Sequence, residues 1–471
     1  MLFTRLWFLT AIVTLIKFVV SEEDFLPPNS WENKEFKKTI EVSNSFTTEN
    51  LELTIINIDS EPVTQYFLPI PTDLLPKISM FTAAYMSEES FIQCMLVPGV
   101  HTLADGTKIS YGVIQFESPV APGEEIALLA KIHLAVTGTP FPEEIGMDDT
   151  QSLALDVNRY PISPYLSKTA SVDVAGAEDF TELTPAESDD ESGILLTGQF
   201  KYGPFHNVPP FTSSWAKVSY PVDYPLITVT DLKRDIWISH WAHTAEFQEY
   251  YEIVNQGAKL KNGFSRVEFM KRVQRTEGKG GNFIGVLGLS MTENSTDAYV
   301  TDKVGKVSSV MREEDKLLLK PRFPVFGGWF YNFTVGWTNT LDDFLHTSNT
   351  EQDAFVIALP VLNGPPDTIY RNAEVSVILP EGAEVIDVGS PLPFANATVS
   401  REYSYFDLAD GHAKLTFYYS NLISELGSGE LVVKYKLNAN SLYQKALYIS
   451  YYVFGALMTL FVLINLNLNI K

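Results

Sequence analysis

Two histidines three residues apart are the first candidates for chemistry in this sequence of 471 residues. His240 and His243 occur in "SHWAH", and histidines hold a metal ion when their side chains converge on it. Residues three apart in a β-strand point to opposite faces, and no HExxH motif occurs in the chain. We therefore expect both histidines to pack within a strand or to lie at the surface.

The other patterns that could support catalysis are weak. The glycine-rich stretch Gly278–Gly288 fits neither GxGxxG nor GxxxxGK[ST], so it predicts a turn. The carboxylate pairs Asp148–Asp149 and Asp342–Asp343 would face apart in a strand. Cys94 has apolar neighbours in "FIQCMLV", which indicates inert packing, and as the only cysteine it excludes a disulfide within the chain. We expect no catalytic residue, metal or cofactor.

A more unusual stretch is "PRFPVFGGWFYNFTVGWTN", Pro321–Asn339. Strand alternation places Trp329, Tyr331, Phe333, Val335 and Trp337 on one face, and Phe330, Asn332, Thr334 and Gly336 on the other. Five alternate apolar residues favour a buried sheet face. The alternative is a partner-binding face beside a glycan.

Three Asn-X-Ser/Thr sequons are candidate N-glycosylation sites. They are Asn294 in "NST", Asn332 in "NFT" and Asn396 in "NAT". Each alone is a weak signal, but all three lie between the two terminal hydrophobic segments. Their placement agrees with a body exposed to the secretory lumen.

The two ends of the chain predict the compartment. Residues 1–21 read as a cleaved signal peptide, with an apolar run and cleavage between Ser21 and Glu22. At the other end, Ala446–Leu466 is an uncharged run long enough to cross a bilayer, and tyrosines crowd its start. We expect a transmembrane helix with its flank over 443–466 and a short cytosolic tail over 467–471.

A GPI signal is the alternative for this terminal segment, but its spacer is long and its tail is polar. Within the helix, Gly455 and Thr459 lie four residues apart. Such small residues allow a second helix to approach closely, so these two residues are candidates for helix packing in the membrane.

The composition limits the possible partners and the fold class. The formal charge is −24, and an acidic surface repels phosphate backbones, so we exclude a nucleic-acid partner. Aromatic residues make up 13%, a composition typical of β proteins. The body alternates with period two, as in "LELTIINI" and "KISYGVIQF", which predicts antiparallel sheets. The best helical pattern outside the ends lies at 297–319.

A short internal repeat suggests two related domains. "KKTIEVS" (Lys37–Ser43) is followed by a strand that ends at Asn57, and "KRDIWIS" (Lys233–Ser239) by one that ends at Asn255. The predicted fold is therefore mainly β, with two β-sandwich-like domains at 22–225 and 226–442 ahead of one C-terminal transmembrane helix.

Three long blocks carry a family resemblance. They are "RDIWISHWAHTAEFQEYYEIVNQGAKLKNGFSR" (Arg234–Arg266), Pro321–Asn339 as quoted above, and "VLNGPPDTIYRNAEVSVILPEGAEVIDV" (Val361–Val388). They closely resemble ribophorin I, the alpha subunit of the eukaryotic oligosaccharyltransferase complex. Weaker similarity in "WENKEFKKTIEVSN", "YGVIQF" and "EEIGMDDTQ" extends over nearly all of the mature chain.

The resemblance implies a non-catalytic subunit in the membrane of the endoplasmic reticulum. In this family the complex transfers a preassembled oligosaccharide from dolichyl diphosphate to Asn-X-Ser/Thr of nascent proteins, and the chemistry with its divalent metal belongs to a separate multi-spanning subunit. The implied partners are that catalytic subunit, small membrane subunits, membrane lipid and nascent polypeptide. The implied topology is single-pass, with lumenal domains and a cytosolic C-terminus. The chain ends soon after Leu466, without the cytosolic domain of animal members, which resembles fungal members.

Two alternatives stay open at this point. Paired β domains on one helix also describe a free-standing adhesion or glycan-binding ectodomain. A secretory peptidase or glycosidase is the third possibility, because β domains can hold carboxylate sites without a sequence signature.

Overall fold

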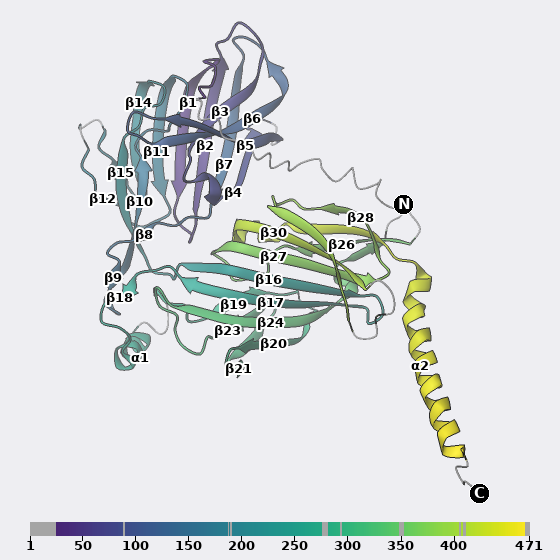
Figure 1. The fold of residues 1–471 in the computed structure, drawn as a ribbon. Coiled ribbons are helices and arrows are strands. Elements are labelled where there is room, and N and C mark those ends of the chain that lie inside the picture. Colours follow the sequence, from purple (N-terminus) through teal and green to yellow (C-terminus); the bar gives the residue numbers. More distant parts are fainter. Residues whose placement is uncertain are drawn as a thin grey trace.

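A computed structural model describes residues 25–87, 90–186, 188, 191–275, 281–292, 294–347, 353–404, 407 and 411–466. The expected signal peptide with Ser21 and Glu22, and the expected tail at 467–471, lie outside the described residues. The fold is mainly β with a long C-terminal helix, as the sequence predicts. We call residues 25–222 the N-terminal half and residues 227–437 the C-terminal half (Figure 1).

The N-terminal half contains two sheets that pack face to face. Side chains of both meet in one core, for example Ile40 and Val174 with Leu153 and Val218. The larger sheet has the order β13 (Ile194–Leu196), β14 (Gln199–Val208), β11 (Ser167–Ala175), β1 (Trp31–Glu41), β2 (Thr47–Asn57), β7 (Glu125–Leu134), β4 (Ile78–Tyr85), β5 (Phe91–Thr102), β6 (Lys108–Val120) and β3 (Val63–Pro71). The smaller sheet has the order β12 (Thr181–Glu182), β15 (Trp215–Val222), β10 (Gln151–Asn158) and β8 (Thr139–Pro140).

The C-terminal half is built around an eight-stranded sheet that two smaller sheets cover. The large sheet has the order β21 (Gly305–Lys306), β20 (Thr296–Asp302), β24 (Phe330–Thr340), β17 (Thr244–Asn255), β16 (Ile227–Ser239), β27 (Thr368–Glu381), β30 (His412–Ile423) and β29 (Asn396–Glu402). The first smaller sheet has the order β25 (Leu345–Thr347), β26 (Ala354–Pro360), β31 (Glu430–Lys436) and β28 (Glu384–Gly389). The second has the order β19 (Leu287–Ser290), β23 (Lys316–Leu319) and β22 (Val310–Glu313). Phe333, Val433 and Leu317 from the three sheets share one core.

The two segments of the internal repeat have the same strand pairing. In the N-terminal half β1 pairs antiparallel with β2 and parallel with β11. In the C-terminal half β16 pairs antiparallel with β17 and parallel with β27. Each hairpin carries a register shift near its start, between Asn33 and Glu35 and between Val229 and Asp231.

The asparagine of each repeat has a structural role. Asn57 and Asn255 are buried at the ends of β2 and β17. Each side-chain oxygen accepts the backbone N–H two residues ahead, from Asp59 at 2.8 Å and from Gly257 at 2.9 Å. An Asn side chain that bonds the backbone two residues on forms the turn that ends the strand.

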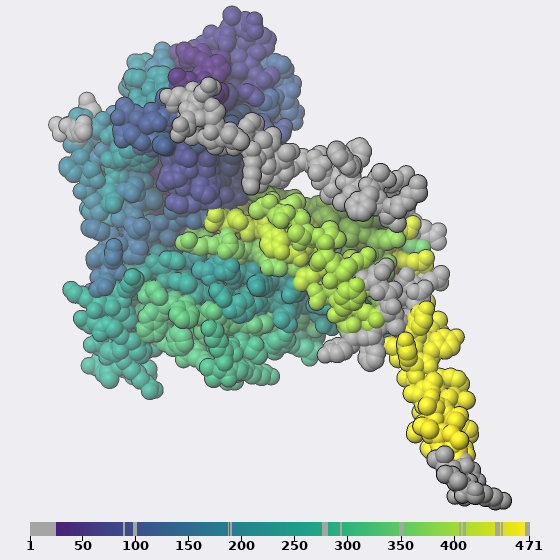
Figure 2. Space-filling model, in the orientation of Figure 1, coloured from purple at the N-terminus to yellow at the C-terminus, as the bar shows by residue number. Residues whose placement is uncertain are grey.

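Several contacts between described residues join the two halves, and two of them lie at different places. Short parallel strands pair across them, β9 (Glu144–Ile145) with β18 (Lys259–Leu260). At the second place Ser45 donates its backbone N–H to the Asp367 carboxylate at 2.5 Å. Figure 2 shows the halves in broad contact.

Two helices of eight residues or more lie within the described residues, α1 (Arg266–Arg275) and α2 (Ala439–Asn465). Short 3-10 turns occur at Leu75–Lys77, Leu341–Asp343 and Ser424–Ser428. The helix predicted at 297–319 is wrong, because this segment forms β20 to β23. Leu317 of this segment pairs with Leu289 of β19, and both side chains are buried in the core of the C-terminal half.

Candidate functional site

The two histidines of "SHWAH" have separate roles. His240 Nε2 lies 2.6 Å from the Tyr435 hydroxyl, and its ring packs on Phe355. Burial, with a contribution from His243, lowers the pKa of His240 to about 4, so its ring is neutral at pH 7. His243 is exposed and lies 3.0 Å from the Asp342 carboxylate. In the described parts of the chain, no group of three or more His, Cys, Asp or Glu residues could hold a metal ion.

The remaining candidates for catalysis are bound to structural partners. Burial raises the pKa of the Cys94 thiol to about 12, which leaves it protonated and a poor nucleophile. The Asp148 carboxylate accepts from Arg275 at 2.8 Å, and the Asp149 carboxylate accepts from the Gly146 backbone N–H at 2.8 Å. These carboxylates organise the surface near α1.

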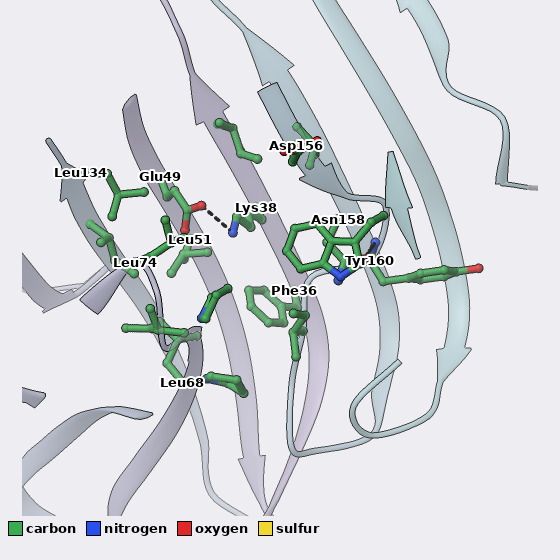
Figure 3. A pocket seen from close by; sticks show the side chains of 18 residues that line it. Phe36, Lys38, Glu49, Leu51, Leu68, Leu74, Leu134, Asp156, Asn158 and Tyr160 are labelled. Atoms are coloured by element: carbon green, nitrogen blue, oxygen red, sulfur yellow. Dashed lines mark hydrogen bonds and ion pairs between the residues drawn. The ribbon is translucent and has the colours of Figure 1, made fainter. Parts of the chain in front are cut away.

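A cavity of about 70 Å³ opens between the strands of the N-terminal half (Figure 3). Its wall is mostly apolar, with Phe36, Leu51 and Leu68 among its residues, and Lys38 forms an ion pair with Glu49 at 2.7 Å beside it. An apolar cavity of about 150 Å³ is large enough to hold benzene, so this smaller space is not suited to a sugar ring or a peptide.

The aromatic strand chiefly builds the core, as predicted. In β24 the side chains of Tyr331, Phe333, Val335 and Trp337 are buried. The Trp337 ring stacks on Phe247 with centroids 5.0 Å apart. These aromatic rings fill the space between the sheets of the C-terminal half.

The glycines of this strand permit close approaches. A Cβ at Gly336 would lie 2.5 Å from the Tyr299 ring, and a Cβ at Gly327 would lie 2.1 Å from the Ala258 carbonyl oxygen. Gly328 has a φ of 78°, a conformation that favours glycine. The glycine pair therefore lets the chain cross tightly under Ala258 before Trp329.

The same crossing produces an aromatic surface at the junction of the two halves. Phe264, Phe269, Phe326 and Trp329 contact one another with ring centroids 5.7–6.0 Å apart. A shallow hollow of about 190 Å³ lies next to them, lined by Lys259, Leu260, Gly263, Gly327, Gly328 and Trp329. Phe264, whose ring contacts Trp329, is exposed beside it. Sequence reasoning found the glycine pair and Trp329 but missed Phe264 and α1, because a short helix that interrupts strands gives little periodic signal.

The three sequons lie on different parts of the C-terminal half. Asn294 is exposed in the turn before β20, and its amide donates to Asp343 at 3.1 Å. Asn332 is half-buried within β24, where its amide donates to the Tyr250 hydroxyl at 3.3 Å. Asn396 is exposed and begins the edge strand β29. They form no common cluster, so they are separate candidate modification sites.

The C-terminal helix stands apart from the body (Figure 2). Residues Ala446–Asn465 are apolar enough to cross a membrane, and none of this segment is buried inside the protein. No described atom outside its own helix lies within 4 Å of a Cβ built at Gly455. The Thr459 hydroxyl donates to the Gly455 carbonyl at 2.8 Å, which satisfies this polar group and leaves a flat helix face at the two residues.

The comparisons with known proteins cover both the β-sheet body and the C-terminal helix. A family model described as Ribophorin I matches residues 31–464. The dolichyl-diphosphooligosaccharide–protein glycosyltransferase subunit 1 of Schizosaccharomyces pombe is 26% identical over 432 residues, which cover 88% of this chain and 90% of that protein. Subunit 1B of Arabidopsis thaliana is 26% identical over 387 residues, covering 79% of this chain and 80% of the relative. Subunit 1 of Caenorhabditis elegans is 24% identical over 389 residues, covering 80% and 63%.

Solved structures add no further argument. An M1 zinc metallopeptidase from Deinococcus radiodurans overlays 44% of this chain and 42% of its own at a TM-score of 0.26 and 10% identity, which is too low to indicate a shared fold. The family match, in contrast, covers every sheet and almost all of α2. The protein belongs to the ribophorin I family.

Proposed function

We propose that this protein is a non-catalytic subunit of the oligosaccharyltransferase complex in the membrane of the endoplasmic reticulum. The observation that carries the proposal is the family match across residues 31–464, shared with relatives named as subunit 1 of this glycosyltransferase. The complex transfers a preassembled oligosaccharide from dolichyl diphosphate to Asn-X-Ser/Thr of nascent chains. This chain supports the assembly of that machine and presents substrate to it.

The non-catalytic role is supported by the surroundings of each candidate group. His240 is neutral against Tyr435, Cys94 is a protonated thiol, and the carboxylates Asp148 and Asp149 hold neighbouring groups. A general base or a nucleophile needs reach to a substrate and a matched pKa. These groups serve the fold instead, and the chemistry falls to a multi-spanning partner subunit.

The proposed topology places domains 22–225 and 226–442 in the lumen, α2 across the bilayer and residues 467–471 in the cytosol. The three sequons support it, because Asn294, Asn332 and Asn396 all precede α2 and sequon glycosylation is lumenal. Under this proposal all three asparagines carry glycans. The signal peptide at 1–21 is removed between Ser21 and Glu22.

We place partner contacts of α2 at the face of Gly455 and Thr459. The helix has no packing partner within the described chain, and small residues on one face allow a second helix to approach in a bilayer. The multi-spanning catalytic subunit and small membrane subunits are the partners that this face would contact. Nascent polypeptide is a further partner, for which the aromatic surface at the junction is the candidate site.

The test is purification of the tagged full chain in mild detergent, with mass spectrometry of its partners and of its own glycopeptides. Gly455→Leu with Thr459→Leu is expected to lower the amount of co-purified catalytic subunit several-fold. The matched control adds bulk to the opposite face, as Val453→Leu with Leu457→Phe, and is expected to leave partners in place. Recovery of the wild-type chain alone, with processed surface-type glycans, would refute the complex-subunit proposal. Equal partner yields from both variants would refute only the helix face.

A further inference from the structure

The charge of one segment runs against that of the whole protein. Residues 259–322 contain 13 Lys and Arg against 8 Asp and Glu, a net charge of +5, whereas the chain as a whole carries −24. This segment connects β17 to β24 and includes α1 and the β20–β21 hairpin. A local basic surface on an acidic protein selects negatively charged partners.

One side of α1 is fixed and the other is free. Phe269 packs against Phe283 and Phe326, and Arg272 donates to the Met147 carbonyl, so these residues attach the helix to the body. On the outer side Val267 is 65% exposed and Met270 is 52% exposed.

Basic residues accompany these apolar side chains on α1. Arg266 and Lys271 are exposed next to Val267 and Met270. Apolar and cationic side chains together on the outer side of a helix are typical of helices that lie in the interface of a membrane.

The tip of the β20–β21 hairpin repeats this combination. Val304 is 79% exposed, and Lys303 and Lys306 are exposed on either side of it. Asp302 fixes the turn by accepting the backbone N–H groups of Val304 and Gly305 at 2.9 and 3.1 Å.

The charge of Asp302 is compensated. Its carboxylate accepts from Arg322 at 2.5 Å, and this guanidinium lowers the pKa of Asp302 below its usual range. The tip is therefore a turn fixed by hydrogen bonds, with the apolar side chain of Val304 between two lysines.

Both features lie on the side of the molecule toward which α2 runs. Figure 1 shows α1 and the β20–β21 hairpin at the lower edge of the C-terminal half, with α2 descending from the same half and the N-terminal half on the far side. The link between body and helix is short, because Leu437 is buried in the core and α2 begins at Ala439. A helix that spans the bilayer thus holds this edge near the headgroups.

We propose that α1 and the tip of the β20–β21 hairpin form a second membrane contact, which binds the phosphate groups of lipids in the bilayer that α2 crosses. Lysine and arginine pair with the phosphates, while Val267, Met270 and Val304 enter the boundary between headgroups and acyl chains. The inference rests on the proposed function only in requiring that α2 span the membrane. It gives the body a fixed tilt relative to the bilayer.

The experiment uses the full chain in vesicles of phosphatidylcholine and phosphatidylinositol, with Cys94→Ser removing the single native thiol. Bimane is attached at Val267→Cys or Val304→Cys, and its quenching by a lipid with a nitroxide headgroup is measured. Phe91→Cys, in β5 on the far side of the molecule, is the negative control, and Leu463→Cys in α2, read with an acyl-chain nitroxide, reports insertion. Quenching at 267 and 304, but not at 91, is expected.

Charge variants distinguish binding to lipid phosphates from mere closeness of the labelled residues to the bilayer. Lys271→Glu with Lys303→Glu is expected to abolish most of the quenching at 267 and 304, whereas Lys108→Glu, an exposed lysine of the N-terminal half, leaves it unchanged. High salt is expected to weaken the quenching, since it screens exposed charges.

Three results would overturn the inference. With the probe at 463 quenched, signals at 267 and 304 no larger than at 91 would refute the lipid contact while leaving the spanning helix intact. Shielding at 267 and 304 that appears only in the assembled complex would assign this surface to a protein partner. A probe at 463 that stays unquenched would refute the spanning helix and the inference with it.

Discussion

Replacing Arg234 by methionine is expected to cost the C-terminal half a large part of its stability. Arg234 in β16 lies opposite Glu249 in β17, and their ion pair is completely buried. The Tyr251 hydroxyl donates to the other Glu249 oxygen at 2.6 Å. Burial, and then the Glu249 carboxylate, raise the pKa of Tyr251 well above its ordinary value, so this donor keeps its proton. Arg234→Met would leave the buried Glu249 carboxyl group without its charged partner.

The magnitude follows from the loss of one partner of a buried pair, which costs about 3–5 kcal/mol. Typical total stabilities are about 5–15 kcal/mol, so the loss is a major fraction. At about 2–4 °C per kcal/mol for a domain of this size, the unfolding midpoint should fall by about 6–20 °C. Burying the wild-type pair itself costs free energy, because Nε and Nη2 of Arg234 have no hydrogen-bond partner within the described atoms.

The assay is thermal unfolding of the full chain in detergent, followed by tryptophan fluorescence. Arg234→Met with Glu249→Leu is expected to recover much of the loss, since apolar residues of similar volume often replace a buried pair at little cost. Lys37→Met is the control, because Lys37 pairs with Glu52 in the related hairpin of the N-terminal half but both side chains are over one third exposed. It should cost about 0–1 kcal/mol. A loss from Arg234→Met no larger than that from Lys37→Met would refute the reasoning.

Two further changes test the fold. Gly327→Ala is expected to destabilise the junction by about 1–3 kcal/mol, because the added Cβ would meet the Ala258 carbonyl oxygen. Gly389→Ala is the control, because a Cβ at that position has no atom within 4 Å. Equal unfolding midpoints for the two variants would contradict this reasoning. Burial is the main cause that lowers the pKa of His133 and of His240 to about 4, so the unfolded state binds these protons first and stability should fall as the pH drops from about 6.5 to about 4. His133→Gln with His240→Gln should flatten this dependence of the unfolding midpoint, and an unchanged slope would show that other groups cause it.

The parts of the fold that sequence predicted are those with local, periodic signals. The alternation of Tyr331, Phe333, Val335 and Trp337 identified a buried strand face, and the paired asparagines marked two related hairpins. Each of these signals is a pattern within a few residues of chain. Period-two burial needs no knowledge of the partner strand.

What sequence missed depends on contacts between distant segments. The helix predicted at 297–319 failed because the partner of Leu317, Leu289, comes from a strand that the local pattern does not reveal. Helix α1 was missed because its fixed side packs on Phe283 and Phe326, which lie outside the helix in the sequence. The two halves are joined by β9 and β18, strands of two residues each, which are too short to give a periodic signal.

The position of β31 in its sheet has a consequence for synthesis. This strand, Glu430–Lys436, is the last strand of the described residues, yet it lies between β26 and β28 and pairs with both. Chains emerge N-terminus first at about 5–20 residues per second, so β26 and β28 must wait without their common neighbour until residue 436 has been made. The next segment to emerge is α2, which begins three residues later. The C-terminal half therefore completes its folding in the same moments in which the membrane helix is delivered, and a nascent chain arrested before Glu430 would hold this sheet open.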